Sequence, residues 1–327
     1  MKFPWKDLPL IKYKTSDNAN LFFYRRKAKN KSKGTLLFLC GWSQGPNNWS
    51  PCLLTNEYVK EHYNVYVLVM RGYKNIEDNF SNNISRYAKD VVEFIHSKKL
   101  NKITAVGHSM GSSIFWNVLS LYGEKFFDSY VFIDQPLQVL KNPDKFINEL
   151  NDMGSIFSSN DLFSFYNSSA ESSSKSAENR GSFEQKCFSP EFIAKYPNIY
   201  IKCLAGVYGY NYKVANEILF DHVLNNYDQI FKSFPNKLQN PVLLIGGKAS
   251  IVPYQTLDYQ KQYYITPTVK IFEIDEGGSH SMYLENYELF NNTLNDFLKK
   301  NEGVLQKIKI NIDNGISKTK KLFEEII

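Results

Sequence analysis

Short runs of consecutive apolar residues recur along the chain, each with the length of a strand that is buried on both faces. Five of these runs occupy residues 34–40, 65–70, 103–106, 130–133 and 242–245. A sixth run, at 269–274, alternates apolar and polar residues at its ends, which is typical of a strand nearer a sheet edge. Ahead of them, residues 11–26 predict a hairpin that turns at Asp17 and Asn18.

Segments in which apolar residues recur every three or four positions separate several of these runs. They lie at 87–98, 112–121 and 283–299. Strands that alternate with helices predict an α/β fold, with a mainly parallel sheet and helices on both of its faces. Ligands of such sheets bind beyond the carboxyl ends of the strands, so we expect the chemistry just after the apolar runs.

The alternation stops between residues 137 and 236 and resumes at Pro241. Because long unstructured loops inside a compact domain are usually functional lids, we interpret this stretch as an inserted helical cap with a flexible Ser-rich loop. A disordered linker between two domains is the alternative. The loop is predicted at 155–182, between helices predicted at 143–152, 189–196 and 211–232.

The sequence therefore divides into three predicted regions. Residues 1–136 and 237–300 form the α/β core, and residues 137–236 form the cap. The remaining residues, 301–327, form a Lys-rich amphipathic tail. We expect this tail to be an ordinary packed helix, with contact to a membrane surface or a partner as the alternative.

Composition narrows the class of protein further. The net charge of +6 comes from scattered lysines, whereas a nucleic-acid-binding protein gathers its basic residues on one face or helix. We therefore expect no nucleic-acid partner.

No run approaches the roughly 18–20 apolar residues that span a bilayer. The four cysteines, at 40, 52, 187 and 203, show neither a CxxC pair nor metal-ligand spacing, and the first residues lack the apolar stretch of a signal peptide. We expect free thiols, a cytoplasmic protein, and neither a metal nor an organic cofactor.

The sequence Gly-His-Ser-Met-Gly at 107–111 fits the nucleophile elbow G-x-S-x-G. This turn from strand to helix is so tight that the nucleophile adopts strained backbone angles, and small residues on either side relieve the crowding. A predicted strand precedes the motif and a predicted helix follows it, as an elbow requires. We therefore predict Ser109 as a nucleophile.

A nucleophilic serine needs an oxyanion hole and a general base. The backbone N–H of Met110 follows the nucleophile, and Trp42, just after the first long apolar run, is placed to supply a second N–H. Of the five histidines, His108 lies inside the elbow, and we assign His62, His96 and His222 to helices away from the site. His280 follows the last predicted strand directly, so elimination and placement both favour it as the base.

These motifs resemble the α/β-hydrolase superfamily, especially its esterase and non-haem haloperoxidase-like branch. The resemblance rests on Cys-Gly-Trp at 40–42, the elbow, and Gly-Ser-His at 278–280 followed by Tyr-Leu-Glu-Asn at 283–286, and it extends over about 34–136 and 238–299. It implies that Ser109 is the nucleophile, that His280 is the base, and that Trp42 and Met110 provide the oxyanion donors. The chain departs from the family at Cys40, where a histidine is common.

The second departure concerns the acid of the triad. Family members usually carry it in a G-x-x-D loop, where this chain reads Gly-Lys-Ala-Ser at 247–250, and Ser250 cannot stabilise an imidazolium as a carboxylate does. Asp134 ends the strand after the nucleophile's own, a position that holds the acid in some superfamily members. We predict Asp134 as the acid, with Glu276 and Asp275 as the alternative acids. The alternative role for Asp134 is purely structural, since Asp-Gln-Pro at 134–136 is also a reasonable turn.

The sequence thus predicts a serine hydrolase that acts on an ester, a thioester or a similar acyl substrate. We expect a small-molecule substrate, and the 15% aromatic content favours an apolar one. Two alternatives stay open: the same triad used for perhydrolysis or C–C bond cleavage, and a non-catalytic binding protein that retains the fold.

Overall fold

A computed structural model of the chain describes residues 3–74, 81–141 and 154–302. The helix predicted at 143–152 and nearly all of the predicted tail lie outside these residues.

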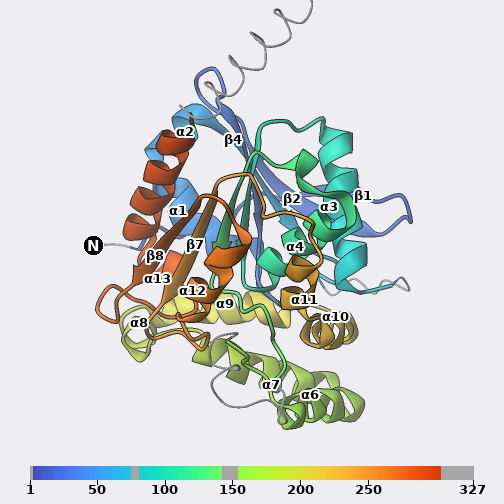
Figure 1. The fold of residues 1–327 in the computed structure, drawn as a ribbon. Coiled ribbons are helices and arrows are strands. Elements are labelled where there is room, and N and C mark those ends of the chain that lie inside the picture. Colours follow the sequence, from blue (N-terminus) through green and yellow to red (C-terminus); the bar gives the residue numbers. More distant parts are fainter. Residues whose placement is uncertain (1–2, 75–80, 142–153, 303–327) are drawn as a thin grey trace, which may run out of the picture.

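One sheet runs through the centre of the molecule (Figure 1). In the described part of the chain it has eight strands in the order β1-β2-β4-β3-β5-β6-β7-β8. The strands from β4 to β8 are parallel, whereas β1 and β2 are antiparallel to their neighbours. Their bounds are β1 Ile11–Lys14, β2 Asn20–Arg26, β3 Gly34–Leu39, β4 Tyr63–Val69, β5 Ile103–His108, β6 Ser129–Ile133, β7 Val242–Gly247 and β8 Pro267–Phe272. The mainly parallel sheet, the N-terminal hairpin and the edge position of the last strand are confirmed.

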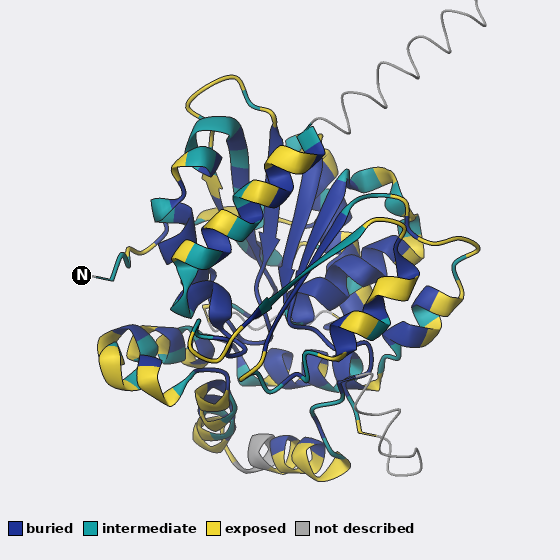
Figure 2. Cartoon of the chain, turned by 60° about the vertical axis from the view of Figure 1, so that its left-hand side comes forward, coloured by how far each residue is buried: buried dark blue, intermediate teal, exposed yellow. Residues whose placement is uncertain are grey.

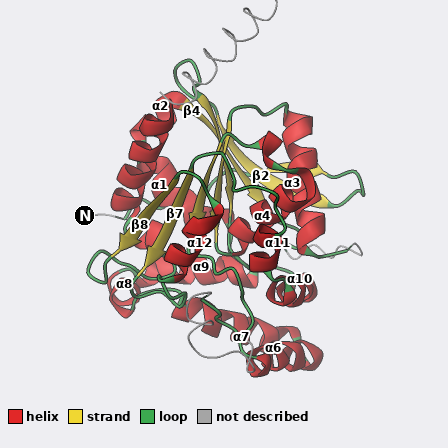
Figure 3. Cartoon of the chain, in the orientation of Figure 1, coloured by secondary structure: helices red, strands yellow, loops and turns green. Residues whose placement is uncertain are grey.

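Helices cover both faces of this sheet (Figure 3). One face is covered by α3 Ile84–Lys98, α4 Met110–Tyr122 and α12 Thr256–Gln260. The other is covered by α1 Ser50–Thr55, α2 Glu57–His62, α13 Met282–Glu285 and the helix at 287–302. Single 3₁₀ turns lie at η1 Pro46–Trp49, η2 Glu124–Phe126 and η3 Lys261–Tyr263. The helix predicted at 283–299 is therefore two helices, divided at Asn286, whose side-chain amide donates a hydrogen bond to the Glu276 carbonyl.

The central strands bury both of their faces, and they appear uniformly dark in Figure 2. In β3, Leu37 and Leu39 contribute to the hydrophobic core beneath α3 and α4, while Leu36 and Phe38 contribute to the core beneath α1 and α13. Successive side chains of a strand point to opposite faces, so each run of apolar residues supplies two cores at once. This explains why these strands are continuous apolar runs rather than alternating ones.

The Ser-rich segment, for which the sequence predicts a loop, is instead helical. It contains α6 Ser159–Glu171 and most of α7 Ser173–Lys186. The hydroxyl of Ser172 caps α7 by accepting a hydrogen bond from the Lys175 N–H, and Leu162 and Phe165 of α6 are buried. Serine is a weak helix former, but N-capping and tertiary packing outweigh that propensity here.

The cap has four further helices in the described residues. They are α8 Pro190–Lys195, α9 Pro197–Tyr208, α10 Tyr212–Leu224 and α11 Tyr227–Lys232. The helices α6 and α7 contact each other and lie farthest from the sheet, beyond α9 and α10 (Figure 1). The long helix predicted at 211–232 is two helices, and α9 was not predicted. None of the helices in the described ranges is both long and apolar enough to cross a bilayer.

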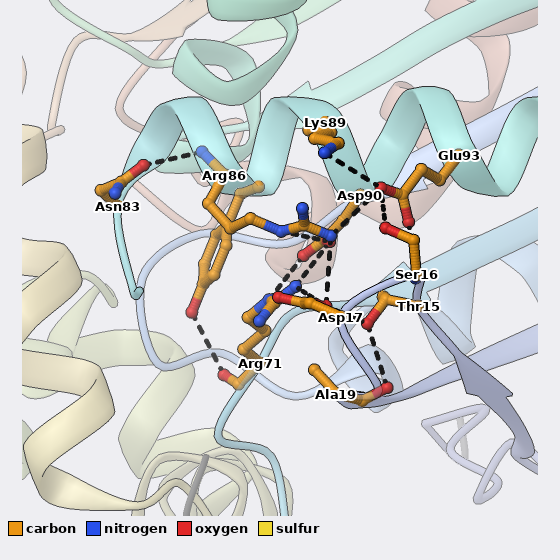
Figure 4. A network of polar contacts seen from close by, with 11 residues as sticks. Thr15, Ser16, Asp17, Ala19, Arg71, Asn83, Arg86, Lys89, Asp90 and Glu93 are labelled. Carbon is orange, nitrogen blue, oxygen red and sulfur yellow. Dashed lines mark hydrogen bonds and ion pairs between the residues drawn. The ribbon is translucent and has the colours of Figure 1, made fainter. Parts of the chain in front are cut away.

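A buried ion-pair network fastens the N-terminal hairpin to β4 and α3 (Figure 4). Arg71, just after β4, is 1% exposed and donates hydrogen bonds from Nε and Nη2 to Asp90 of α3 at 2.7 and 2.8 Å. Its Nη2 also donates to Asp17 of the hairpin turn at 2.9 Å. Arg86 contacts both carboxylates. Buried charges need such partners, because an unpaired charge in the interior costs several kcal/mol.

We therefore expect Asp90→Asn to lower the free energy of unfolding by about 3–5 kcal/mol, because it leaves the buried Arg71 guanidinium without its main carboxylate. Urea unfolding of the two proteins measures the difference. Glu57→Gln is the matched control, since the exposed Glu57 has only Lys29 and Lys60 as ion-pair partners among the described residues and its loss should change stability little. Equal stability of Asp90→Asn and wild type would contradict this role of the network.

Candidate active site

The strand β5 ends at His108 and α4 begins at Met110, so a single residue, Ser109, makes the turn between them. Its backbone has φ 51° and ψ −127°, which is a strained conformation for a residue with a side chain. The flanking glycines allow it: a Cβ at Gly107 would lie 2.6 Å from the Ser112 nitrogen, and one at Gly111 would lie 2.7 Å from the Leu39 carbonyl oxygen. Ser109 is only partly buried, while both of its neighbours are buried. The segment therefore has the geometry of a nucleophile elbow.

The loop after β3 packs against this elbow. A Cβ at Gly41 would lie 3.2 Å from the Ser109 Cβ, so the backbone of this loop passes directly beside the serine. The Trp42 indole N–H donates a hydrogen bond to the Ala215 carbonyl of α10 at 2.6 Å, which holds the loop to the cap. Among the described residues, we find no hydrogen-bond acceptor for the backbone N–H of Trp42 or of Met110. Two N–H groups beside a serine are the donors that an oxyanion hole needs.

The structure brings His280 and Asp134 together across 146 positions of sequence. Asp134 directly follows β6, with φ 53°, and its N–H donates to the Ile245 carbonyl of β7 at 2.8 Å. Its Oδ2 lies 2.5 Å from Nδ1 of His280. Because a carboxylate can only accept, Nδ1 carries the proton, and Nε2 of the neutral imidazole is left with a lone pair.

Ser250 occupies the position where the family usually carries its acid, and it supports Asp134. Its hydroxyl donates a hydrogen bond to the same Oδ2 that faces His280. Burial raises the pKa of Asp134, and the hydrogen bond from Ser250 opposes that shift by stabilising the carboxylate. Burial also lowers the pKa of His280, which keeps the imidazole neutral near pH 7.

The two alternative acids lie elsewhere. Asp275 is exposed, and Glu276 accepts a hydrogen bond from the Glu273 N–H within its own turn at 3.0 Å. Of the other histidines, His62 ends α2, His96 lies in α3, and His222 lies in α10 beside the Tyr227 hydroxyl at 3.0 Å.

Comparison with known proteins agrees with this geometry. A family model described as alpha/beta hydrolase fold matches residues 34–287. This chain belongs to the α/β-hydrolase fold family. A comparison with curated protein sequences finds no match.

Several solved structures share the fold over most of the chain. A bromoperoxidase from Bacillus anthracis has a TM-score of 0.74 at 16% identity, covering 89% of this chain and all of its own. An esterase from Exiguobacterium antarcticum has a TM-score of 0.69 at 15% identity, covering 88% of this chain and 98% of its own. An enol-lactonase from Burkholderia xenovorans LB400 has a TM-score of 0.69 at 13% identity, covering 88% of this chain and 100% of its own. At these identities, the likeness shows the fold alone.

The loop that carries His280 in this α/β-hydrolase is held on several sides. The Ser281 N–H donates to the Cys187 carbonyl at 3.0 Å, and the Ser279 hydroxyl donates to Glu285 at 2.7 Å. Glu285 also accepts two hydrogen bonds from Ser189, at the start of α8. These contacts tie the loop to the cap.

The sequence analysis did not predict Ser250 as a partner of Asp134. It also did not predict Gln44, whose Oε1 lies 2.9 Å from Nδ1 of His108, or Glu184, which accepts a hydrogen bond from Gln44. Ser250 could have been predicted, because it carries a hydroxyl at the position where the family usually carries its acid. Nothing in the local sequence marks Glu184, which lies 140 positions from its hydrogen-bond partner Gln44.

A cavity of about 230 Å³ lies between α6, α7 and the loop after β7. Its lining is half apolar, from Ile156, Phe157, Phe165, Phe183 and Ile251, and half polar, from Asp161, Ser164, Asn179, Ser182 and Lys186. The rings of Phe165 and Phe183 lie 5.3 and 5.8 Å from the ring of Trp42, so the cavity adjoins the loop that faces Ser109.

Within the described ranges, no group of three or more His, Cys, Asp or Glu residues is arranged to hold a metal ion. All four cysteines are buried free thiols.

Proposed function

We propose that this α/β-hydrolase is a serine hydrolase that cleaves an ester or a related acyl substrate, with Ser109 as nucleophile, His280 as base and Asp134 as acid. The contact that carries the proposal is the one between His280 Nδ1 and Asp134 Oδ2, at 2.5 Å. It fixes the tautomer in which Nε2 can accept a proton, and it places a carboxylate where the positive charge of the imidazolium develops.

In the proposed reaction, the Ser109 oxygen attacks the carbonyl carbon and its proton passes to Nε2 of His280. The N–H groups of Trp42 and Met110 stabilise the negative oxygen of the tetrahedral intermediate. The imidazolium then protonates the leaving group, and an acyl group remains on Ser109. Water, deprotonated by His280, attacks this acyl-enzyme and releases the acid and the free serine.

The mixed lining of the cap cavity favours a small-molecule substrate with an apolar part beside a polar one. The cavity beside Trp42 has aromatic walls, and its volume of about 230 Å³ is below the ~300–1,000 Å³ that is usual for drug-sized ligands. We therefore propose a compact acyl or alcohol group as its occupant. A series of acyl esters of graded length would define which chain length fits.

The nucleophile has a direct test. A fluorophosphonate probe should label the wild-type protein at neutral pH, because an activated serine attacks the phosphorus and becomes covalently modified. Ser109→Ala should abolish the labelling. Gel fluorescence with an equal amount of each folded protein measures it, and Ser120→Ala, at an exposed position of the same helix α4, controls for the loss of a serine from this segment. Unlabelled wild type would refute the serine-hydrolase proposal and leave the non-catalytic binding protein in its place.

The acid is tested separately. Asp134→Asn should lower kcat by about 10⁴-fold, because the amide stabilises the wrong tautomer of His280 and cannot balance the imidazolium. Hydrolysis of a short p-nitrophenyl ester measures the loss. Glu276→Gln is the matched control and should retain near wild-type activity. The reverse outcome, a silent Asp134→Asn and a crippled Glu276→Gln, would assign the acid to Glu276.

A further inference from the structure

The loop between β3 and η1 contains a tight turn at residues 41–44, with Trp42 as its second residue. A hydrogen bond from the Gln44 N–H to the Gly41 carbonyl, at 3.2 Å, closes its main chain. The third residue, Ser43, has φ 54°, in the left-handed region that such turns usually give to glycine or asparagine. Because Trp42 supplies one of the two proposed oxyanion donors, the shape of this turn decides where that N–H points.

Gln44 fixes both peptide units that meet at Gly41. The Gly41 carbonyl and the Trp42 N–H belong to the same planar peptide unit, so the bond from the Gln44 N–H to this carbonyl also orients the Trp42 N–H. The preceding peptide unit is held by the side chain of Gln44, whose Oε1 accepts from the Gly41 N–H at 3.2 Å. Glycine has no side chain to restrict its backbone, and a Cβ at this position would lie 2.8 Å from Gln44 Oε1. The side chain of Gln44 therefore removes the freedom that a glycine brings to the turn.

The same oxygen of Gln44 contacts the other parts of the site. Nδ1 of His108, the residue before Ser109, lies 2.9 Å from it. The Tyr283 hydroxyl of α13, just after the His280 loop, donates to it at 3.4 Å. Gln44, His108 and Tyr283 are at most 2% exposed, so solvent cannot replace these contacts. One buried carboxamide thus joins the turn to the elbow and to the helix that follows the base.

The cap holds Gln44 at its remaining polar atoms. The main-chain carbonyl of Gln44 accepts from the Tyr210 hydroxyl at 3.1 Å, and its side-chain amide donates to Oε1 of Glu184 at 3.4 Å. The backbone of α9 lies close as well, since a Cβ at Gly45 would be 3.5 Å from the Gly206 Cα. Each of the four polar atoms of Gln44 therefore has a partner, two of them within the turn and two in the cap.

We propose that Gln44 is a positioning residue for the oxyanion hole, which orients the Trp42 N–H toward Ser109, and that the cap holds Gln44 through Tyr210 and Glu184. This role rests on the proposed function, because an oxyanion hole matters only to acyl transfer at Ser109. Gln44 acts through the turn rather than on the substrate. Its loss should therefore weaken the stabilisation of the transition state and leave substrate binding nearly unchanged.

Hydrogen exchange tests the turn without a substrate. Gln44→Met keeps the length of the side chain but removes its acceptor and its donor. The Gly41 N–H should then exchange at least about tenfold faster than in wild type, because it is left without an acceptor. Nitrogen–proton NMR of protein with isotope-labelled glycine measures the rate.

Gln138→Met is the matched control, since Gln138 is also a buried glutamine, and its amide donates to the Leu140 carbonyl at 3.1 Å. The Gly41 N–H should exchange at the wild-type rate in this variant. Equal rates in wild type, Gln44→Met and Gln138→Met would overturn the role of Gln44 in the turn.

Steady-state kinetics with a short p-nitrophenyl ester test the positioning role. Complete loss of an oxyanion donor costs about 10²–10³-fold in kcat, so a displaced donor in Gln44→Met should cost about 10–100-fold, with KM changed by less than about twofold. Gln138→Met should keep near wild-type kcat. The exchange of the two side chains, Gln44→Glu with Glu184→Gln, again offers an oxygen to the Gly41 N–H and an amide donor between the two positions, and it should recover most of the loss. A folded Gln44→Met with wild-type kcat, or a folded exchange variant no more active than Gln44→Met, would overturn the proposal.

A spectroscopic signature separates the oxyanion hole from a general loss of structure. An activated serine adds to a trifluoromethyl ketone as a hemiketal, and N–H donors lower the pKa of the hemiketal hydroxyl by stabilising its ionised oxygen. Fluorine NMR of the adduct should show this hydroxyl titrating at higher pH in Gln44→Met than in wild type and Gln138→Met. The same titration in all three proteins would overturn the positioning role.

Failure of this proposal and failure of the proposed function give different results. A wild type that reacts with the fluorophosphonate and the ketone, beside an unaltered Gln44→Met, refutes the role of Gln44 alone. A wild type that reacts with neither refutes the proposed function and the oxyanion role together, and the exchange rate of the Gly41 N–H still decides whether Gln44 holds the turn.

Discussion

The proposed active site depends on one carboxylate–imidazole contact, between Asp134 at the end of β6 and His280 after β8. Neither side chain reaches the other because of local sequence. The parallel sheet places the carboxyl ends of β5 and β6 next to each other, and the Asp134 N–H bonds to the Ile245 carbonyl of β7, so that the carboxylate faces the His280 loop. In the proposed mechanism this pair activates Ser109, since an isolated serine is a weak nucleophile.

Burial imposes the second constraint. Polar groups that are shielded from water must find partners inside the protein, and the cap supplies many of them. The carbonyl of Cys187 and the side chain of Ser189 hold the His280 loop from one side, while Glu184 and Gln44 support it through His108 from the other. The cap therefore does more than cover a cavity, because it completes the hydrogen bonding of the loop that carries His280. The buried Arg71 network plays a corresponding structural role where it joins the hairpin to α3.

Sequence patterns predicted the features that depend on local geometry. The apolar runs gave the central strands, because a strand buried on both faces has no polar side, and Gly107 and Gly111 marked the turn at Ser109. Elimination placed His280 after the last strand and the resemblance placed Asp134 after β6, and the structure brings the two together. The Ser-rich helices α6 and α7 were missed because capping by Ser172 and packing of Phe165 outweigh weak propensity. Glu184 was missed because its partner lies far away in sequence, and no local pattern reports a long-range contact.

The most direct measurement transfers the carboxylate from position 134 to position 250. The hydroxyl of Ser250 already bonds to Asp134 Oδ2, so a carboxylate at 250 would reach the same edge of His280. Asp134→Ser should lower kcat/KM by several orders of magnitude, and Asp134→Ser combined with Ser250→Asp should recover at least about tenfold of that loss, because a carboxylate again faces Nδ1. Circular dichroism establishes that both variants are folded. An Asp134→Ser protein as active as wild type, or a folded double variant no more active than Asp134→Ser, would contradict the account.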